Sequence, residues 1–429
     1  MSATEGISFW PMTDVGKVRD HNEDSFLVDK KLNLFVVADG MGGHAAGEVA
    51  SQIASRTVRD VIARERDALH EFEAGQGVGR TDILRLLESA VQQACSAVFG
   101  EAQKDESKRG MGTTLDALLL IGSRGFIAHV GDSRVYLYRQ GAVHQLTEDH
   151  SLINELLRRG RLSREQIEKL QYKNAVTRAV GVYESVEVDT LDFDVLKGDR
   201  FLLCSDGLSG YLEEAQLAQL FADTPEDQLA QRLVDLANDA GGKDNITAIV
   251  IKVPDAESGV DRLAREVNLK LEVLHRMPLF RHLTYQELVR VLNITTVRNY
   301  DADAAIFAQG EEGDELFIVL TGQVRVHAGD AILTRLGPGQ HFGEMALVDK
   351  APRSAAISAD EPTKLLVIRR RDFFDIVRKD HAIAVKLLWS FLGVLTERLR
   401  TANRELGEAK EKIEQGGDDD SLSDALLPD

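Results

Sequence analysis

The chain is poor in several residue types, and each shortage excludes a class of protein. Its 429 residues include only Cys95 and Cys204, so neither a disulfide framework nor a cysteine-rich zinc site is available. Apolar runs such as residues 32–38 fall far short of the roughly 20 residues that a membrane-spanning helix needs. The first ten residues carry Glu5 and lack a basic region followed by an apolar core, so we expect no secretory signal. Together these shortages predict a cytoplasmic protein with no membrane partner.

Positive charge is scarce as well. The chain has 51 Lys and Arg against 70 Asp and Glu, which gives a formal net charge of -19. Nucleic-acid binding relies on basic surfaces that neutralise phosphates, so we expect no nucleic-acid partner. An acidic protein can still act on phosphate groups where metal ions supply the local positive charge. This directs attention to clustered carboxylates.

The first part of the chain, residues 1–253, alternates short apolar runs with amphipathic stretches. Strands are predicted where the runs are short and rich in β-branched or aromatic residues, at 34–38, 125–130, 134–139, 200–204 and 246–253. Helical spacing of apolar residues predicts helices at 45–66, 81–99 and 226–238. A polar Pro/Gly stretch at 254–259 marks a domain boundary.

The second part, from residue 254 onward, differs in its predicted secondary structure. Residues 254–277 are predicted to form a linker and a helix, and residues 278–380 are strand-rich and punctuated by glycine, as in a small β-barrel or jelly roll. Residues 381–414 return to a helical pattern, and residues 415–429 form an acidic tail predicted to be disordered. Leucines at 388, 392, 395, 399 and 406 form a seam that suits either internal packing or a homodimer coiled coil.

Acidic residues stand at the ends of several apolar runs in the first part. Asp39 and Asp206 each come after a predicted buried strand and directly before glycine. A single Asp-Gly pair is usually an ordinary turn. Carboxylates gathered with a backbone carbonyl and waters, however, are the ligands that Mg²⁺ and Mn²⁺ prefer. Two such ions can activate a water for attack on phosphorus, and a nearby arginine can hold the phosphate.

Seven motifs in order resemble those of bacterial type 2C (PPM) metal-dependent serine/threonine protein phosphatases. They are Val-x-x-x-Asn-Glu-Asp, Ala-Asp-Gly-Met-Gly-Gly-His, Met-Gly-Thr-Thr, Gly-Asp-Ser-Arg, Leu-Thr-x-Asp-His-Ser, Ser-Asp-Gly-Leu and Asp-Asn-Ile-Thr. The resemblance covers residues 8–253 and implies a four-layer α-β-β-α sandwich that binds two Mn²⁺ or Mg²⁺ ions. It implies metal ligation by Asp39, the Gly40 carbonyl, Asp206 and Asp244, by Glu23 and Asp24 through water, and by Asp132 at a third site.

In this resemblance Asp39 bridges both ions, Asp206 belongs to the second site, and Arg19 binds the phosphate. Animal members have a histidine after the Asp-Gly pair, where this chain has Met41, as bacterial members do. The general acid therefore stays unassigned, with a metal-bound water as the expected substitute and His44 as a structural residue. Residues 152–175 correspond to the family's flap, but their sequence differs from the relatives there.

A second candidate site lies in the glycine-punctuated part. A cyclic nucleotide needs a cation for its phosphate, an acceptor for its ribose hydroxyl and exposed backbone amides. Arg353, Glu344 and the backbone of residues 343–346 could supply them, although Glu344 and Arg353 could also form an ordinary surface ion pair. The sequence around them resembles the phosphate-binding cassette of cyclic-nucleotide-binding domains, which implies ligand contacts from Gly343, Glu344, Met345, Ala346, Arg353 and Ser354.

The resemblance favours cAMP over cGMP, because Ser354 stands where cAMP-binding bacterial regulators carry serine. The whole chain is thus predicted to be an α+β enzyme that dephosphorylates phosphoserine and phosphothreonine in proteins and is regulated by cyclic nucleotide. Two alternatives remain open. One is a non-catalytic signalling adaptor with a nucleotide-sensing barrel, and the other is a phosphatase whose barrel is a targeting module.

Overall fold

The computed structural model describes residues 4, 6–42, 46–158, 175–255, 262–329, 331–349 and 351–416. The chain forms two compact units. Unit 1 comprises Met1–Lys270 together with Tyr285–Asn293, and unit 2 comprises Leu271–Thr284 together with Ile294–Asp429. No helix within the described ranges is long and apolar enough to cross a bilayer.

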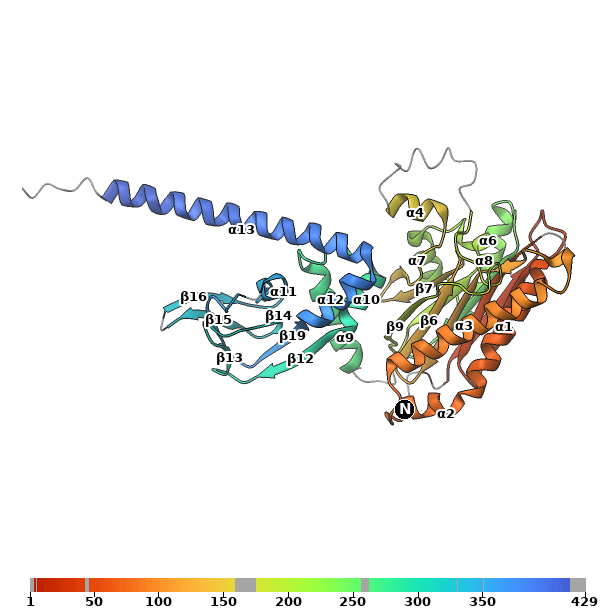
Figure 1. Ribbon diagram of the computed structural model, residues 1–429, viewed down its shortest axis with the longest axis horizontal. Coiled ribbons are helices and arrows are strands. Elements are labelled where there is room, and N and C mark those ends of the chain that lie inside the picture. The colour runs from red at the N-terminus through yellow and green to blue at the C-terminus, as the bar shows by residue number, and fades with distance from the viewer. Residues whose placement is uncertain are drawn as a thin grey trace, which may run out of the picture. The chain divides into compact units, whose positions relative to one another are not determined.

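Two antiparallel sheets form the centre of unit 1 (Figure 1). The first has the order β1-β11-β10-β7-β8, with strands Ser8–Asp14, Ile246–Lys252, Arg200–Cys204, Arg134–Arg139 and Ala142–Gln145. The second has the order β2-β3-β5-β6-β9, with strands Asp24–Asp29, Leu34–Met41, Leu115–Ile121, Arg124–Val130 and Asp189–Asp194. The short strand β4 (Gly112–Thr113) pairs with β3.

Helices cover the outer face of each sheet. Helices α1 (Ala46–Arg64) and α3 (Arg80–Ala102) pack on the second sheet, and α7 (Glu214–Asp223) and α8 (Glu226–Asp239) pack on the first. Small residues at a spacing of four, Ala50 and Ala54, face the sheet from α1 and are fully buried. This arrangement confirms the predicted α-β-β-α sandwich.

Most element boundaries agree with the sequence patterns, but one helix is shorter than expected. The helix predicted over 45–66 ends at Arg64, because Glu65 has a non-helical backbone (φ -97°, ψ 24°). A separate helix, α2 (Arg66–Glu73), follows it. The shorter elements are η1 (Glu106–Lys108), α4 (Leu152–Arg158) and α6 (Asp206–Ser209).

Unit 2 contains the predicted β-barrel. One sheet has the order β12-β19-β14-β17, with strands Thr295–Tyr300, Thr363–Arg369, Glu315–Thr321 and His341–Phe342. The other has the order β13-β18-β15-β16, with strands Ala305–Phe307, Ala356–Ala359, Val324–Ala328 and Ala331–Leu336. Stacked rings of Phe317 and Phe342, with centroids 5.1 Å apart, lie in the apolar core of the barrel.

Helices flank the barrel in the sequence. Helix α9 (Arg262–Arg276) precedes it, α11 (Met345–Val348) interrupts it, and α12 (Arg370–Lys379) and α13 (His381–Gly416) follow it. The start of α13 buries Ile383, Leu387 and Phe391. The predicted leucine seam lies elsewhere on α13, with Leu388, Leu392, Leu395, Leu399 and Leu406 all exposed. The acidic tail beyond residue 416 lies outside the described residues.

The segment Tyr285–Asn293 forms an additional helix, α10, within the stretch expected to be strand-rich. It belongs to unit 1, where it packs against β8 and β9. Its amphipathic sequence is visible in the chain, but the surface that it covers depends on contacts between distant segments. The domain boundaries derived from the sequence stay predictions.

Candidate active site

Neighbouring strands bring the first carboxylates together. In the pairing of β2 with β3, Asp24 lies directly opposite Asp39. The residue before Asp24, Glu23, accepts a hydrogen bond from the backbone N–H of Gly40 through its own carbonyl, at 3.2 Å. The Asp39 backbone is held on its other side by Thr114, whose hydroxyl accepts from the Asp39 N–H at 2.9 Å. Asp39 lies inside β3, two residues before that strand ends.

The other sheet supplies two more predicted residues. Asp206 is the first residue of α6, one residue beyond the end of β10, and its carboxylate lies beside that of Asp39. Asp244 precedes β11, and its Oδ2 accepts a hydrogen bond from Nη2 of Arg19 at 2.7 Å. Asp132 follows β6 and is buried within electrostatic range of Asp206. The structure thus gathers all seven N-terminal site residues whose side chains were predicted to act: Arg19, Glu23, Asp24, Asp39, Asp132, Asp206 and Asp244.

The carboxylates destabilise one another's charged forms. Burial, together with the charges of neighbouring carboxylates, raises the pKa of Asp24 to about 7 and that of Asp132 to about 7. The same two causes raise the pKa of Asp39 well above its usual range and also raise the pKa of Asp206. Asp24 Oδ1 is buried and has no hydrogen-bond partner within the described part of the protein. The cluster therefore has an unbalanced negative charge that suits a bound cation.

The backbone at Gly40 is too closely surrounded to accommodate a side chain. A Cβ atom at Gly40 would lie 2.2 Å from the Gly47 carbonyl oxygen and 2.5 Å from that of Glu23, so only glycine fits. In the residues that the structure describes, no three His, Cys, Asp or Glu side chains form a ready-made metal cage. Mg²⁺ and Mn²⁺ retain several waters and use few carboxylates each, so the residues present fit such ions.

Several residues that support the site had no role assigned from the sequence. Ser205 donates a hydrogen bond from Oγ to Asp24 Oδ2 at 2.8 Å, and Asn245 Oδ1 accepts from the Glu23 N–H at 2.8 Å. Thr114 holds Asp39, as described above. All three stand inside the quoted motifs, and Ser205 and Asn245 each adjoin a candidate ligand in the sequence, which is the signal that could have identified those two.

Two sequence expectations cannot be placed. His44 and most of the predicted flap, residues 159–174, lie outside the described residues.

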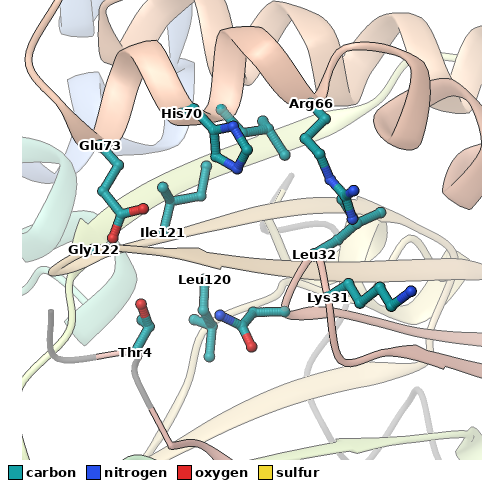
Figure 2. A pocket seen from close by; sticks show the side chains of 11 residues that line it. Thr4, Lys31, Leu32, Arg66, His70, Glu73, Leu120, Ile121 and Gly122 are labelled. Carbon is teal, nitrogen blue, oxygen red and sulfur yellow. The ribbon is translucent and has the colours of Figure 1, made fainter.

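A separate cavity of about 270 Å³ lies beyond the start of β3, lined by Asn33 and the basic side chains of Lys31, Arg66 and His70 (Figure 2). None of the predicted site residues lines this cavity, so it is not part of the carboxylate site.

In unit 2, Arg353 lies between aromatic rings and glycine backbone. Its guanidinium carbon is 4.2 Å from the centre of the Phe307 ring, and Nη2 donates to the Glu315 carbonyl at 3.0 Å. Burial lowers the pKa of Arg353, and Nε is buried without a hydrogen-bond partner within the described ranges. A Cβ at Gly313 would lie 2.3 Å from this Nε, so the guanidinium packs directly against the glycine.

The remaining cassette residues surround the short helix α11. Gly343 has a positive φ of 75°, which favours glycine, and Glu344 directly precedes the helix. Glu344 is buried, with 5% of its surface exposed, which disagrees with a surface ion pair. Ala346 is buried, whereas Met345 and Ser354 are exposed.

Comparison with known proteins decides the family. A model described as "Protein phosphatase 2C" matches residues 17–242, which is more than half of the chain. The chain belongs to the protein phosphatase 2C family. A second model, "Cyclic nucleotide-binding domain", matches residues 297–380 of this 2C phosphatase. Both resemblances noted in the sequence are thereby confirmed.

Relatives and solved structures agree with this assignment. The 2C phosphatase is 39% identical to serine/threonine phosphatase stp of Listeria innocua, over 58% of this chain and 97% of that protein. It is 38% identical to serine/threonine protein phosphatase PstP of Mycobacterium tuberculosis, over 58% of this chain and 45% of that protein. The crystal structure of the Mycobacterium tuberculosis serine/threonine phosphatase PstP/Ppp matches with a TM-score of 0.51 and 35% identity, covering 58% of this chain and 99% of that one. The predicted enzyme class, a protein serine/threonine phosphatase, is confirmed by these matches.

Proposed function

We propose that the chain hydrolyses phosphoserine and phosphothreonine in phosphorylated protein substrates at the carboxylate cluster of unit 1. The supporting observation is the uncompensated group of buried carboxylates around Asp39, with Asp24 Oδ1 lacking a partner. Divalent cations, Mn²⁺ or Mg²⁺, would supply an activated water and neutralise charge on the phosphate. The residues that would hold them are Asp39, the Gly40 carbonyl, Asp206 and Asp244, with Glu23 and Asp24 through water and Asp132 at a third position.

Arg19 is the group that would bind the substrate phosphate. Its guanidinium is partly exposed and pairs with Asp244 through Nη2, so its other donors can reach a ligand. A guanidinium can hold two phosphate oxygens at once, which fixes the orientation of phosphorus. The pairing with Asp244 keeps the guanidinium beside the carboxylate cluster.

Phosphate release from a phosphothreonine peptide, titrated with Mn²⁺, tests this function. We expect release to need metal, and Asp39→Asn to reduce kcat at least about 100-fold, the scale of losing one group that stabilises a transition state. Asp223→Asn, an exposed aspartate at the end of α7, is the matched control and should behave like the wild type. Metal-loaded wild type that releases no phosphate would instead favour the adaptor alternative.

We further propose that the barrel binds a cyclic nucleotide, with cAMP favoured over cGMP, and that binding regulates the phosphatase. The support comes from Arg353, whose Nε has no partner among the described residues and whose guanidinium packs against Gly313 and Gly343. Calorimetric titration of the full chain with cAMP and with cGMP measures the preference. Arg353→Ala should abolish binding, while Arg404→Ala on the exposed part of α13 should not change it. No binding of either nucleotide would favour the targeting-module alternative.

Two further proposals concern the cellular location of the protein and its oligomeric state. The two free cysteines, Cys95 and Cys204, are buried thiols, which agrees with a reducing cytoplasm. The exposed seam of α13 at Leu388, Leu392, Leu395, Leu399 and Leu406 supports a homodimer through this helix.

A further inference from the structure

Helix α10 connects two parts of the molecule that the family matches treat separately. It follows the phosphatase match, which ends at residue 242, and precedes the nucleotide-domain match, which begins at residue 297. It nevertheless belongs to unit 1 and packs against β8 and β9. Its two ends are each anchored by specific side-chain contacts.

The first anchor is Tyr285, at the start of α10. Its ring stacks on His144 of β8, with centroids 3.8 Å apart and planes 12° apart. Its hydroxyl accepts a hydrogen bond from Nη1 of Arg139 at 3.1 Å. Arg139 is buried at the end of β7 and is paired with buried Asp199, from Nε to Oδ1 at 2.8 Å. The helix thus completes the hydrogen bonding of a buried ion pair, whose disruption is costly.

The second anchor is Asn293, the last residue of α10. Its Nδ2 donates to the backbone carbonyl of Asp192 at 2.7 Å and to Asp192 Oδ1 at 3.1 Å. Its Oδ1 accepts from Arg124 at 3.1 Å and from Arg80 at 3.3 Å. Asp192 lies in the middle of β9, so α10 fixes this edge strand of the second sheet.

The starts of β7 and β9 are linked to the carboxylate cluster through side-chain contacts. Just before β7, Ser133 hydrogen-bonds Thr114 at 2.7 Å, and Thr114 accepts from the Asp39 N–H. At the start of β9, Asp189 lies 3.3 Å from Nε2 of His150, whose Nδ1 accepts from the N–H of Gly131 at 3.1 Å. Gly131 directly precedes Asp132. β7 therefore contacts α10 at its last residue and is linked from its start to Asp39, whereas β9 contacts α10 at its middle and is linked from its start to the residue before Asp132.

We infer that α10 positions the active site through β7 and β9, with Tyr285 and Asn293 as positioning residues. Chains of hydrogen bonds along rigid elements can carry energetic coupling between distant sites. The barrel's first strand, β12, begins at Thr295, two residues after Asn293. The second part of the inference rests on the proposed nucleotide regulation. In it, α10 is the segment that transmits the effect of nucleotide binding from the barrel to the active site of unit 1.

The test uses the full chain with Asn293→Ala, Tyr285→Phe and the double variant. Asn299→Ala on an exposed position of β12 and Tyr183→Phe at an exposed tyrosine are the matched controls. We measure kcat and KM in Mn²⁺, the ratio of kcat with and without saturating cAMP, and amide hydrogen exchange in β7 and β9. The ratio is informative because a loss of folded enzyme lowers both activities equally and leaves it unchanged.

We expect faster exchange in β9, a change in unliganded kcat of roughly 2- to 30-fold, and a cAMP ratio close to one in the double variant. The controls should match the wild type. If exchange and unliganded kcat of the double variant equal those of the wild type, the positioning role is wrong. If the wild type responds to cAMP and the double variant responds equally, the relay is wrong although the regulation stands. A wild type that binds cAMP without any response refutes the proposed regulation and with it the relay, while exchange and unliganded kcat still decide the positioning role.

Discussion

At the scale of single residues, Asp24 is a buried carboxyl group whose ionisation lowers the stability of the metal-free fold. Burial first, and then the charges of Asp206 and Asp244, raise its pKa to about 7, against about 3.9 in an unfolded chain. Because the folded state holds this proton more tightly, the metal-free protein loses stability as pH rises from about 4 to about 7. We therefore expect Asp24→Asn to raise the unfolding temperature of chelator-treated protein by roughly 5 °C at pH 8, and by less at pH 5.

Thermal denaturation across this pH range, with Asp223→Asn as the control, measures the effect. The exposed control should follow the wild type at every pH, since its carboxylate is solvated. Added Mn²⁺ should narrow or reverse the advantage of Asp24→Asn, because the ion stabilises the wild-type carboxylate. An equal difference at pH 5 and pH 8, or a less stable variant, would contradict an ionised, uncompensated Asp24.

The sequence could identify the acids of the site but not what orients them. Asp39 and Asp206 stand out because each follows an apolar run and precedes glycine. The contact of Ser205 with Asp24 joins residues 181 positions apart, and that of Asn245 with Glu23 joins residues 222 apart. Such pairings depend on strand order and register across two sheets, which short-range patterns do not encode.

At the scale of elements, α13 carries an exposed apolar surface that the phosphatase reaction does not use. Its exposed apolar residues Leu388, Leu392, Leu395 and Leu399 are spaced by four, three and four, as in a coiled-coil seam. We expect the chain to form a dimer of twice its 47.3 kDa mass in light scattering. Leu392→Glu with Leu395→Glu should return it to a monomer, because two charges in each seam would be buried together.

Arg404→Glu, at an exposed polar position of α13, is the control and should leave the dimer intact. A wild-type chain that is monomeric at micromolar concentration would refute the homodimer. Circular dichroism of the double variant checks that the helix itself is retained.

Elements with a strong local pattern are predictable from the sequence, whereas the docking surface of α10 is not. The strand predicted at 134–139 matches β7 as observed, because short β-branched and aromatic runs favour strands wherever they pack. Helix α10 lies in a stretch that the sequence predicts to be strand-rich, although its side chains at Leu288 and Leu292 have helical spacing. Its docking on β8 and β9 joins residues such as Asp192 and Asn293, which are 101 positions apart. A local sequence pattern therefore does not predict where the helix packs.

At the scale of the whole molecule, two compact units with separate cores should respond to separate ligands. A ligand that binds only the folded state stabilises it by about 2.7 kcal/mol at 100 times its Kd, or roughly 5 to 10 °C for units of this size. We expect Mn²⁺ to raise the unfolding transition of unit 1, and cAMP that of unit 2, in differential scanning calorimetry.

Single-site variants separate the two effects. Asp39→Asn should remove the Mn²⁺ shift and keep the cAMP shift, whereas Arg353→Ala should do the reverse. If α10 couples the units, each ligand should also move the other unit's transition in the same direction, because coupling between binding sites is reciprocal. Shifts that stay confined to one transition each, in a wild type that binds both ligands, would mean that the two units fold and bind independently.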